Sequence, residues 1–318
     1  MYPTQGTVSS NPKTTTLFVP SWTIGSKTRE LGRFDQYIYF GLTPTPLGIS
    51  ETDSVKQFRD LTPAHNKLLA IAMTNSEANF AILKQPDSQK KIISDAVIIA
   101  KKDGFSGIVL DLEVSALPFP SLEEQITKFT QLFESTTKKS GLSFSLTVFG
   151  DTFYRIRPFD IKTIAKDSDT VWIMSYDFSK ARGNPGPNFP LHGKGKYGYD
   201  MATMADNFLQ FVPNKKIGVI FGLFGYDWIV DSKGNAISRE GVPLTDRQIQ
   251  KQFLSGCEFQ DCIIHRDPDS SETEIHYTDD FGNRHIVWFE DMQSVAQKEA
   301  YLESRGITSF SYWAYSYF

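Results

Sequence analysis

Short runs of apolar residues, rich in β-branched and aromatic side chains, recur along the chain and predict eight β-strands. They cover residues 16–20, 36–40, 67–73, 106–112, 143–149, 170–176, 216–221 and 308–313. Stretches with the apolar period of a helix lie between them, for example at residues 89–102 and 122–139. Strand and helix that alternate in this way are typical of a (β/α)8 barrel, so we predict an α/β fold of the TIM-barrel class.

One long interval between the seventh and eighth strands breaks the alternation. Residues 225–288 contain a helix-like stretch at 245–254 and two strand-like runs, at 274–278 and 285–289, whose short connection predicts a hairpin. Loops after barrel strands build the active face, so we expect this α+β insertion to wall one side of a cleft. The predicted organisation is a flexible tail at residues 1–15 and a barrel at residues 16–318, with residues 229–287 as the insertion.

The helix at residues 122–139 has a specific predicted start. Ser121 precedes it and Glu124 lies three residues further on, which is the spacing of a capping box. In such a box the two side chains bond backbone N–H groups of the first turn, so we expect Ser121 to open the helix.

Composition narrows the class of function. The chain has 318 residues, 40% of them hydrophobic, and a formal net charge of -4. This mild, scattered charge argues against a nucleic-acid-binding surface. The aromatic content of 14% is high, which suits either a large core or a cleft in which flat rings stack on sugar faces.

Two segments bear on the compartment of the protein. Residues 1–16 are polar and contain no apolar stretch, so we expect no signal peptide and no membrane span here, although a chain whose leader had been removed would look the same. Cys257 and Cys262 lack a second pair of metal ligands, so a zinc site is not expected. A local disulfide and two free thiols are equally open.

Two carboxylates lie at the end of the predicted fourth strand, whose sequence GIVLDLE spans residues 107–113. Side chains alternate along a strand, so Val109, Asp111 and Glu113 share one face. The strand is apolar on both faces, as buried parallel strands are, and ionisable groups placed there are paired, neutralised or functional. Helix capping or exposure beyond the strand end is the alternative for the two acids.

The other strand ends add carboxylates and aromatic rings. In a barrel the C-terminal strand ends converge on one mouth, so side chains from distant parts of the sequence meet there. The motifs at these ends are Met174-Ser175-Tyr176-Asp177 after the sixth strand, Tyr226-Asp227-Trp228 after the seventh and Tyr312-Trp313 after the eighth. Acids beside aromatic rings favour a carbohydrate ligand.

These motifs, in this order, resemble glycoside hydrolase family 18, the family of chitinases and related N-acetylglucosaminidases. The resemblance covers the third to the eighth strand and includes the segment VWFED at residues 287–291, followed by Ser294 and Lys298. The last third is most similar to the bacterial branch that includes spore-cortex hydrolases. Several motifs in register make the resemblance specific.

The resemblance implies a retaining hydrolysis in which the N-acetyl group of the substrate replaces the enzyme nucleophile. Glu113 would be the general acid and base, with a pKa raised by its charged neighbour, and Asp111 would orient the acetamido group. Tyr176 would hold the acetamido oxygen. The implied substrate-binding residues are Asp177, Met174, Trp313, Tyr226 and Trp228. The resemblance implies no cofactor and no metal.

Each of these assignments has a purely structural alternative. Met174 and Trp313 can belong to the barrel core, and the pair at residues 176–177 can form a turn. The aromatic residues at 226 and 228 can anchor the insertion.

Val109 departs from the family pattern, which carries an acid at this position. Valine cannot share a proton with Asp111. We therefore expect Asp111 to stay on the side of Glu113, and the two acids to titrate as a simple coupled pair.

We predict an active β-N-acetylglucosaminidase or chitinase that acts on chitin-like or peptidoglycan-like glycans containing N-acetylglucosamine. A catalytically silent sugar-binding protein, a chitinase-like lectin, is the alternative, and the retained Glu113 and Asp111 favour the enzyme. We expect a monomer, located outside the cell or in the cell envelope, with no nucleic-acid partner.

Overall fold

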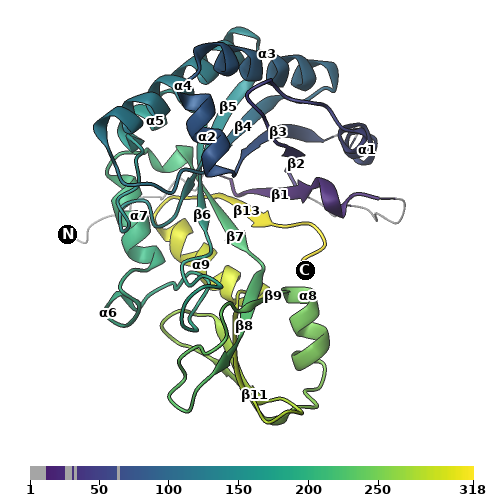
Figure 1. The fold of residues 1–318 in the computed structure, drawn as a ribbon, viewed down its shortest axis with the longest axis vertical. Helices are drawn as coiled ribbons and strands as arrows, with labels where there is room; N and C mark the ends of the chain where they lie inside the picture. The colour runs from purple at the N-terminus through teal and green to yellow at the C-terminus, as the bar shows by residue number, and fades with distance from the viewer. Residues whose placement is uncertain (1–11, 26–30, 32–33, 63–64) are drawn as a thin grey trace, which may run out of the picture.

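The structure, a computed structural model, describes residues 12–25, 31, 34–62 and 65–318. Within these residues eight parallel strands close into a barrel in the order β1-β13-β7-β6-β5-β4-β3-β2 (Figure 1). The barrel strands are β1 (Thr14–Pro20), β2 (Gln36–Leu42), β3 (Asn66–Met73), β4 (Gly107–Leu112), β5 (Ser143–Phe149), β6 (Thr170–Ser175), β7 (Ile217–Gly222) and β13 (Ser309–Trp313). The predicted TIM barrel is confirmed, with each strand close to its predicted bounds.

Helices cover the outside of the barrel (Figure 1). They are α1 (Asp53–Leu61), α2 (Ser76–Leu83), α3 (Pro86–Lys102), α4 (Pro120–Lys139), α5 (Ile161–Asp167), α7 (Met201–Leu209) and α9 (Met292–Ser304). The short helix α6 (Lys194–Tyr197) instead contacts the insertion, and the 3-10 turns η1 (Ser21–Thr23) and η2 (Asn214–Lys216) directly follow β1 and directly precede β7, respectively. None of the helices in the described part of the chain is both long enough and apolar enough to cross a membrane.

The start of α4 differs from the predicted capping box. The helix begins at Pro120, its N-cap is Phe119, and no side chain caps it. Proline has no N–H to satisfy and its fixed φ suits the first helical position, so the helix starts one residue before Ser121. Ser121 therefore lies inside the first turn instead of capping it.

Alternating side chains divide the apolar core into two layers. Leu69, Ile108 and Leu110 lie in the layer between strands and helices. Ala70 and Val109, which are paired across β3 and β4, lie in a second cluster that fills the barrel interior. The face of β4 that carries Val109 thus points into the barrel, and Asp111 follows on that same face.

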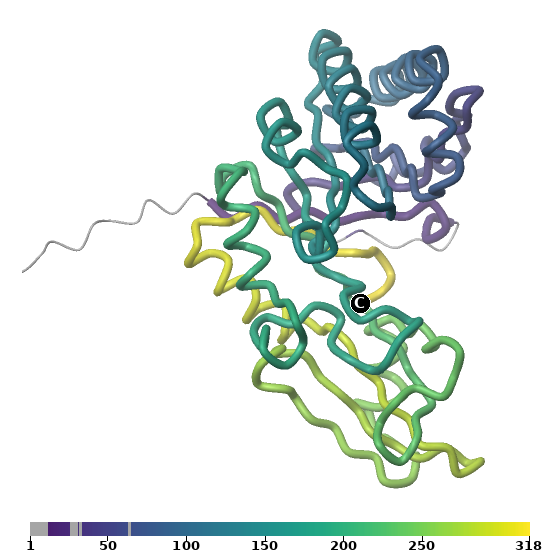
Figure 2. The backbone as a smooth tube through the Cα atoms, turned by 60° about the vertical axis from the view of Figure 1, so that its left-hand side comes forward, coloured from purple at the N-terminus to yellow at the C-terminus, as the bar shows by residue number. Residues whose placement is uncertain are grey.

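The insertion is a five-stranded antiparallel sheet with the order β10-β11-β12-β8-β9. It forms a separate lobe beside the barrel (Figures 1 and 2). Its elements are β8 (Phe224–Val230), β9 (Val242–Thr245), α8 (Asp246–Ile249), the π-helical turn η3 (Gln250–Leu254), β10 (Gln260–Arg266), β11 (Thr273–Thr278) and β12 (Arg284–Phe289). The strands extend beyond the residues 229–287 given to the insertion above.

The predicted hairpin, the two cysteines and the N-terminal tail are placed as follows in the structure. The hairpin is present as β11 and β12. Cys257 and Cys262 form a disulfide, which decides between the two alternatives. Most of the predicted tail, residues 1–11, lies outside the described residues, and Thr14 and Thr15 belong to β1.

A buried ion cluster joins the insertion to α9. Lys298 Nζ lies 2.7 Å from Glu272 Oε1 and also contacts Glu290, and all three side chains have 0% exposure. Burial raises the pKa of Glu290 to about 8, opposed by the ammonium of Lys298 and reinforced by the charge of Glu272. Glu290 Oε2 has no hydrogen-bond partner among the described residues. One carboxyl group of the cluster therefore stays protonated at neutral pH.

This raised pKa predicts that the stability contributed by Glu290 depends on pH. The contribution is fully present below about pH 4.5, where an unfolded glutamate is also protonated, and is lost as the pH rises through about 8. The variant Glu290→Gln should lose less stability between pH 5 and pH 8.5 than the native chain, by on the order of a few kcal/mol. Guanidinium unfolding at several pH values measures this difference.

The matched control is the exposed Glu77→Gln. It should follow the native pH dependence. Parallel curves for Glu290→Gln and the native chain would contradict the assignment.

Candidate active site at the barrel mouth

The backbone at the end of β4 is held by its neighbours. The N–H of Glu113 donates to Met73 O at 2.9 Å, which continues the pairing of β4 with β3 by one residue. The amide of Asn79, from α2, donates to Met73 O at 2.6 Å and to Glu113 O at 2.8 Å. Asn79 is 2% exposed. It thereby fixes the point at which the chain leaves the barrel with its two acids.

Asp111 lies at the top of the barrel interior and is 3% exposed. Its Oδ1 accepts a hydrogen bond from the hydroxyl of Thr147, on the neighbouring strand β5. Burial raises the pKa of Asp111 to about 6, and the bond from Thr147 opposes that rise. The bonded partner of Asp111 therefore comes from β5, which the sequence analysis did not foresee.

Glu113 has the more strongly raised pKa of the two acids. Burial raises it to about 8, and the charges of Asp111 and Asp177 add to the rise. The opposing charges are those of Lys180 and Arg157. Since the two carboxyl groups have pKa values on either side of neutrality, one is mainly ionised and the other mainly protonated at pH 7.

Asp177 follows β6, and its carboxylate is hydrogen-bonded to a residue of the insertion. Its Oδ1 accepts a hydrogen bond from the hydroxyl of Tyr226, on β8, at 2.7 Å. Burial raises the pKa of Asp177, and the bond from Tyr226 opposes the rise. Burial also raises the pKa of the Tyr176 hydroxyl, with further contributions from Asp111, Glu113 and Asp177, so Tyr176 remains a hydrogen-bond donor across the neutral range.

Aromatic rings line the mouth around these acids. Trp313, half-buried at the end of β13, lies 6.4 Å from the ring of Tyr176 in a stacked arrangement and 4.8 Å from Phe40. Trp22, directly after β1, is 61% exposed and lies 6.3 Å from Trp313. Met174 is buried in the barrel interior below them. The planes of the two indoles are tilted by 60° to one another, and together they provide an apolar aromatic surface.

Two of the predicted binding residues occupy different environments. Tyr226 is partly exposed and bonds Asp177, so it belongs to the mouth. Trp228 is 1% exposed, lies in a cluster with Val230 and Ile286, and donates its indole N–H to Ala181 O. The burial of Trp228 supports the alternative role, an anchor inside the insertion.

The sequence patterns did not predict Arg157, a charged residue near the site. Its guanidinium makes two bonds to Asp151, at 2.6 and 3.0 Å, and one to Ser115 at 2.8 Å. It also lies 3.8 Å from the centre of the Phe149 ring. It belongs to the loop after β5, and no motif marks it.

The missed residues differ in how well the sequence signals them. Trp22 follows the first strand directly, so the rule that strand ends meet at one mouth would have found it. Asn79, Thr147 and Arg157 are single polar residues whose partners are distant in sequence. Among the described residues no group of acids, histidines or cysteines is arranged to hold a metal ion.

Chemically, this mouth combines an ionised acid, a protonated acid and a phenol donor beside an aromatic surface. The protonated group can give a proton to a leaving oxygen, and the ionised one can stabilise a positive charge that develops nearby. Aromatic faces suit the apolar faces of sugar rings. The arrangement is therefore suited to acid-catalysed cleavage of a glycosidic bond.

Comparisons with known proteins point in the same direction. The sequence model described as "Glycosyl hydrolases family 18" matches residues 16–317. The chain is 26% identical over 302 residues to the cortical fragment-lytic enzyme of Bacillus anthracis, which covers 90% of this chain and 66% of that protein. It is 24% identical over 284 residues to a class V chitinase of Arabidopsis thaliana, with 79% and 69% covered. The chain spans 54–66% of the length of the Bacillus relatives that it matches.

A solved structure supports the fold. A class V chitinase of Nicotiana tobaccum, in complex with NAG4, matches with a TM-score of 0.78 over 95% of this chain and 94% of that one. The two sequences are 16% identical. The likeness extends over the barrel and the insertion.

The bond from Thr147 predicts how the pKa of Asp111 responds to substitution. The variant Thr147→Val removes the hydroxyl that stabilises the ionised carboxylate, so the pKa of Asp111 should rise above about 6. Carboxyl 13C chemical shifts followed through a pH titration measure this change. Thr147→Ser keeps a hydroxyl and should keep the native value, and an unchanged titration in Thr147→Val would contradict the role of the bond.

Proposed function

The chain belongs to glycosyl hydrolases family 18, and from that premise we propose that it is a retaining glycoside hydrolase that cleaves β-1,4 linkages after N-acetylglucosamine. The observation that carries this proposal is the pair of acids at the end of β4: Asp111 is 3% exposed and accepts a hydrogen bond from Thr147, and burial raises the pKa of Asp111 to about 6 and that of Glu113 to about 8. Groups whose environments drive their pKa values apart can perform acid and base roles in one site.

Glu113 acts first as a general acid. It gives its proton to the glycosidic oxygen while the bond between that oxygen and the anomeric carbon breaks. The carbonyl oxygen of the substrate's own acetamido group bonds to the anomeric carbon, which forms an oxazolinium ion. Glu113, now ionised, accepts a proton from a water molecule whose oxygen opens that ring, and the starting protonation states are restored.

Asp111 supports the acetamido group as a nucleophile. As a carboxylate it accepts a hydrogen bond from the acetamido N–H, which turns the carbonyl oxygen towards the anomeric carbon and stabilises the positive charge. Tyr176 donates its hydroxyl to the acetamido oxygen. Asp111 stays mainly ionised at pH 7 although burial raises its pKa to about 6, and the raised pKa of Tyr176 means that its hydroxyl keeps its proton.

The remaining residues of the mouth bind the sugar. Trp313 lies beneath the ring at the cleavage point, and Met174 lines the same cavity from below. Asp177, oriented by the hydroxyl of Tyr226, binds the distorted sugar. The exposed Trp22 extends the aromatic surface for a neighbouring sugar ring.

Val109 shapes how the acids titrate. It has 0% exposure and lies in the apolar barrel interior on the same face as Asp111. Asp111 therefore has no acid below it with which to share a proton, and its bonded partner is Thr147. The two limbs of the pH profile are accordingly set by Asp111 and Glu113, with the charge of Asp177 adding to the raised pKa of Glu113.

The substrate class is a glycan that contains N-acetylglucosamine, of the chitin or peptidoglycan type. Matched relatives named as a cortical fragment-lytic enzyme and a class V chitinase support this class, as does the tobacco chitinase in complex with NAG4. Such glycans belong to cell walls and spore coverings, so we infer an extracellular or cell-envelope site of action. The reaction as written uses side chains and the substrate alone, without a cofactor.

The first test is turnover by the native chain and by Glu113→Gln. Chromogenic chitobiose and chitotriose, and purified peptidoglycan strands, are incubated with each protein. The native chain should release product, and Glu113→Gln should lose on the order of 1000-fold or more in kcat because the amide cannot give a proton. Product release is measured by absorbance and by chromatography.

The outcomes of this test separate enzyme from lectin. Glycan binding without turnover by the native chain, on every substrate, would contradict the hydrolase and favour the sugar-binding alternative. Equal turnover by both proteins would contradict the role of Glu113 as the general acid.

The pH profile gives a second test. The quantity kcat/KM should fall below about pH 6, where Asp111 becomes protonated, and above about pH 8, where Glu113 loses its proton. In Val109→Asp a new acid on the same strand face couples to Asp111, so the acidic limb should move. Initial rates measured from pH 4 to pH 10 test this, and an acidic limb identical to that of the native chain would contradict the role given to Val109.

A further inference from the structure

Asn188 lies in the loop between β6 and α6 and uses every polar group that it has. It is 2% exposed. Its Oδ1 accepts the N–H of Asp177 at 2.7 Å, and its Nδ2 donates to Gly222 O at 2.9 Å and to Phe224 O at 3.2 Å. Its own carbonyl accepts the N–H of Phe178 at 2.7 Å. One buried side chain therefore connects the end of β6 to the junction of β7 and β8.

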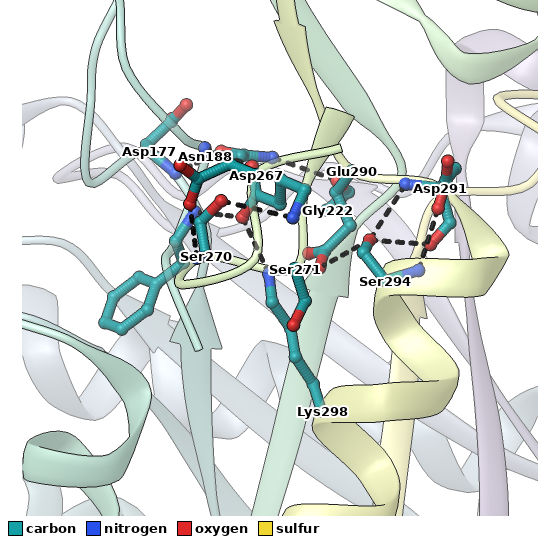
Figure 3. A network of polar contacts seen from close by, with 12 residues as sticks. Asp177, Asn188, Gly222, Asp267, Ser270, Ser271, Glu290, Asp291, Ser294 and Lys298 are labelled. Carbon is teal, nitrogen blue, oxygen red and sulfur yellow. Dashed lines mark hydrogen bonds and ion pairs between the residues drawn. The ribbon is translucent and has the colours of Figure 1, made fainter. Parts of the chain in front are cut away.

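The backbone of Asn188 is held from the other side by the ion cluster. Its N–H donates to Glu272 Oε2 at 2.5 Å, and the N–H of Phe189 donates to Glu272 Oε1 at 2.8 Å. Glu272 is held in turn by Lys298 of α9 at 2.7 Å. Figure 3 shows Lys298 reaching from its helix towards the side of the network on which Asn188 and Asp177 lie.

Asp177 needs such support because of its backbone. Its φ is +56°, in the left-handed region that is unfavourable for a residue with a Cβ. Such a conformation persists only where the surrounding structure determines it. Asp177 donates its N–H to Asn188 Oδ1, and its carboxylate accepts a hydrogen bond from the hydroxyl of Tyr226.

Moving Asn188 would break hydrogen bonds to several other groups. The carbonyls of Gly222 and Phe224 would each lose a donor, and the carboxylate of Glu272 would lose one of its N–H donors. Hydrogen bonds lost from buried polar groups cost free energy, so the network favours a single position for the loop. The insertion and α9 thereby determine the conformation of a residue at the barrel mouth.

We propose that Asn188 is a positioning residue that holds Asp177 in its left-handed conformation beside Glu113, with the cluster of Glu272, Lys298 and Glu290 as its anchor. This inference rests on the proposed function for the role of Asp177 in sugar binding. The position of Asp177 relative to Glu113 is a separate matter that can be measured without any substrate.

The experiment compares Asn188→Ala with Asn188→Asp and with the control Asn184→Ala. Asn184 lies in the same loop, is exposed, and accepts a bond from the N–H of Ala236 in the insertion at 3.1 Å, but it does not contact Asp177. Asn188→Asp keeps the accepting oxygen. Circular dichroism and thermal unfolding establish that each variant is folded.

The first readout is the titration of Glu113, followed by carboxyl 13C shifts. The charged groups that act on Glu113 are Asp111, Asp177, Lys180 and Arg157. When Asp177 leaves its place, its charge no longer raises the pKa of Glu113, so Asn188→Ala should titrate at lower pH than the native chain. Asn184→Ala should titrate like the native chain, and Asn188→Asp should lie nearer to native than Asn188→Ala.

The second readout is kinetic. Displacing a substrate-binding group at the cleavage point should lower kcat of Asn188→Ala by about 10- to 100-fold, with a smaller change in KM. The basic limb of its pH profile, where activity falls as Glu113 loses its proton, should move to lower pH. A general loss of stability would lower the amount of active protein without moving the limb. Asn184→Ala should keep the native kcat and the native limb.

The outcomes distinguish the two proposals. If the native chain shows no turnover, the hydrolase proposal fails, and the Glu113 titration still tests the position of Asp177. A native titration in folded Asn188→Ala overturns the inference. If Asn188→Ala does not fold, Glu272→Gln, which retains one accepting oxygen, replaces it in the same titration, and a native result there overturns the inference as well.

Discussion

Burial of carboxyl groups at the end of a closed barrel is the constraint on which the rest of the site depends. Asp111 is 3% exposed because its strand turns that face inwards, onto an interior filled by apolar side chains such as Val109. A carboxylate in such surroundings is disfavoured unless a donor reaches it, and Thr147 is that donor. Glu113, two residues further along the chain and just beyond β4, keeps its proton to higher pH because burial and the charges of Asp111 and Asp177 raise its pKa.

The insertion contributes to the same site through polar contacts. Tyr226 lies on its strand β8 and Glu290 directly follows β12, and the hydroxyl of Tyr226 donates a hydrogen bond to Asp177 at 2.7 Å. The ion cluster between insertion and α9 fixes the loop after β6 through Asn188. Barrel and insertion therefore form one site, in which the barrel supplies the acids and the insertion supplies the orientation of Asp177.

The sequence predicted the barrel well because its signals are local. Each strand is an apolar run, and the acids of β4 stand out against residues 107–110. The family resemblance then pointed to Glu113, Asp111, Tyr176 and Asp177 as site residues; the fold brings them to one mouth, and their roles stay predictions. The predicted start of α4 was wrong because Pro120 favours the first helical position and so places Ser121, the predicted cap, inside the first turn. Asn188 and Thr147 carried no signal, since their partners are set by the fold and lie far away in sequence.

The closure of the barrel has a consequence for the order in which the protein assembles. The neighbours of β1 are β2 and β13, and Thr14 pairs with Ser309. During synthesis the outer edge of β1 waits, unpaired, until nearly the whole described chain has emerged. Contacts between such distant segments slow folding, and an exposed strand edge attracts other chains. Trp313 lies at the end of the strand that closes the barrel, so the aromatic surface of the mouth is complete only once the first and last strands have paired.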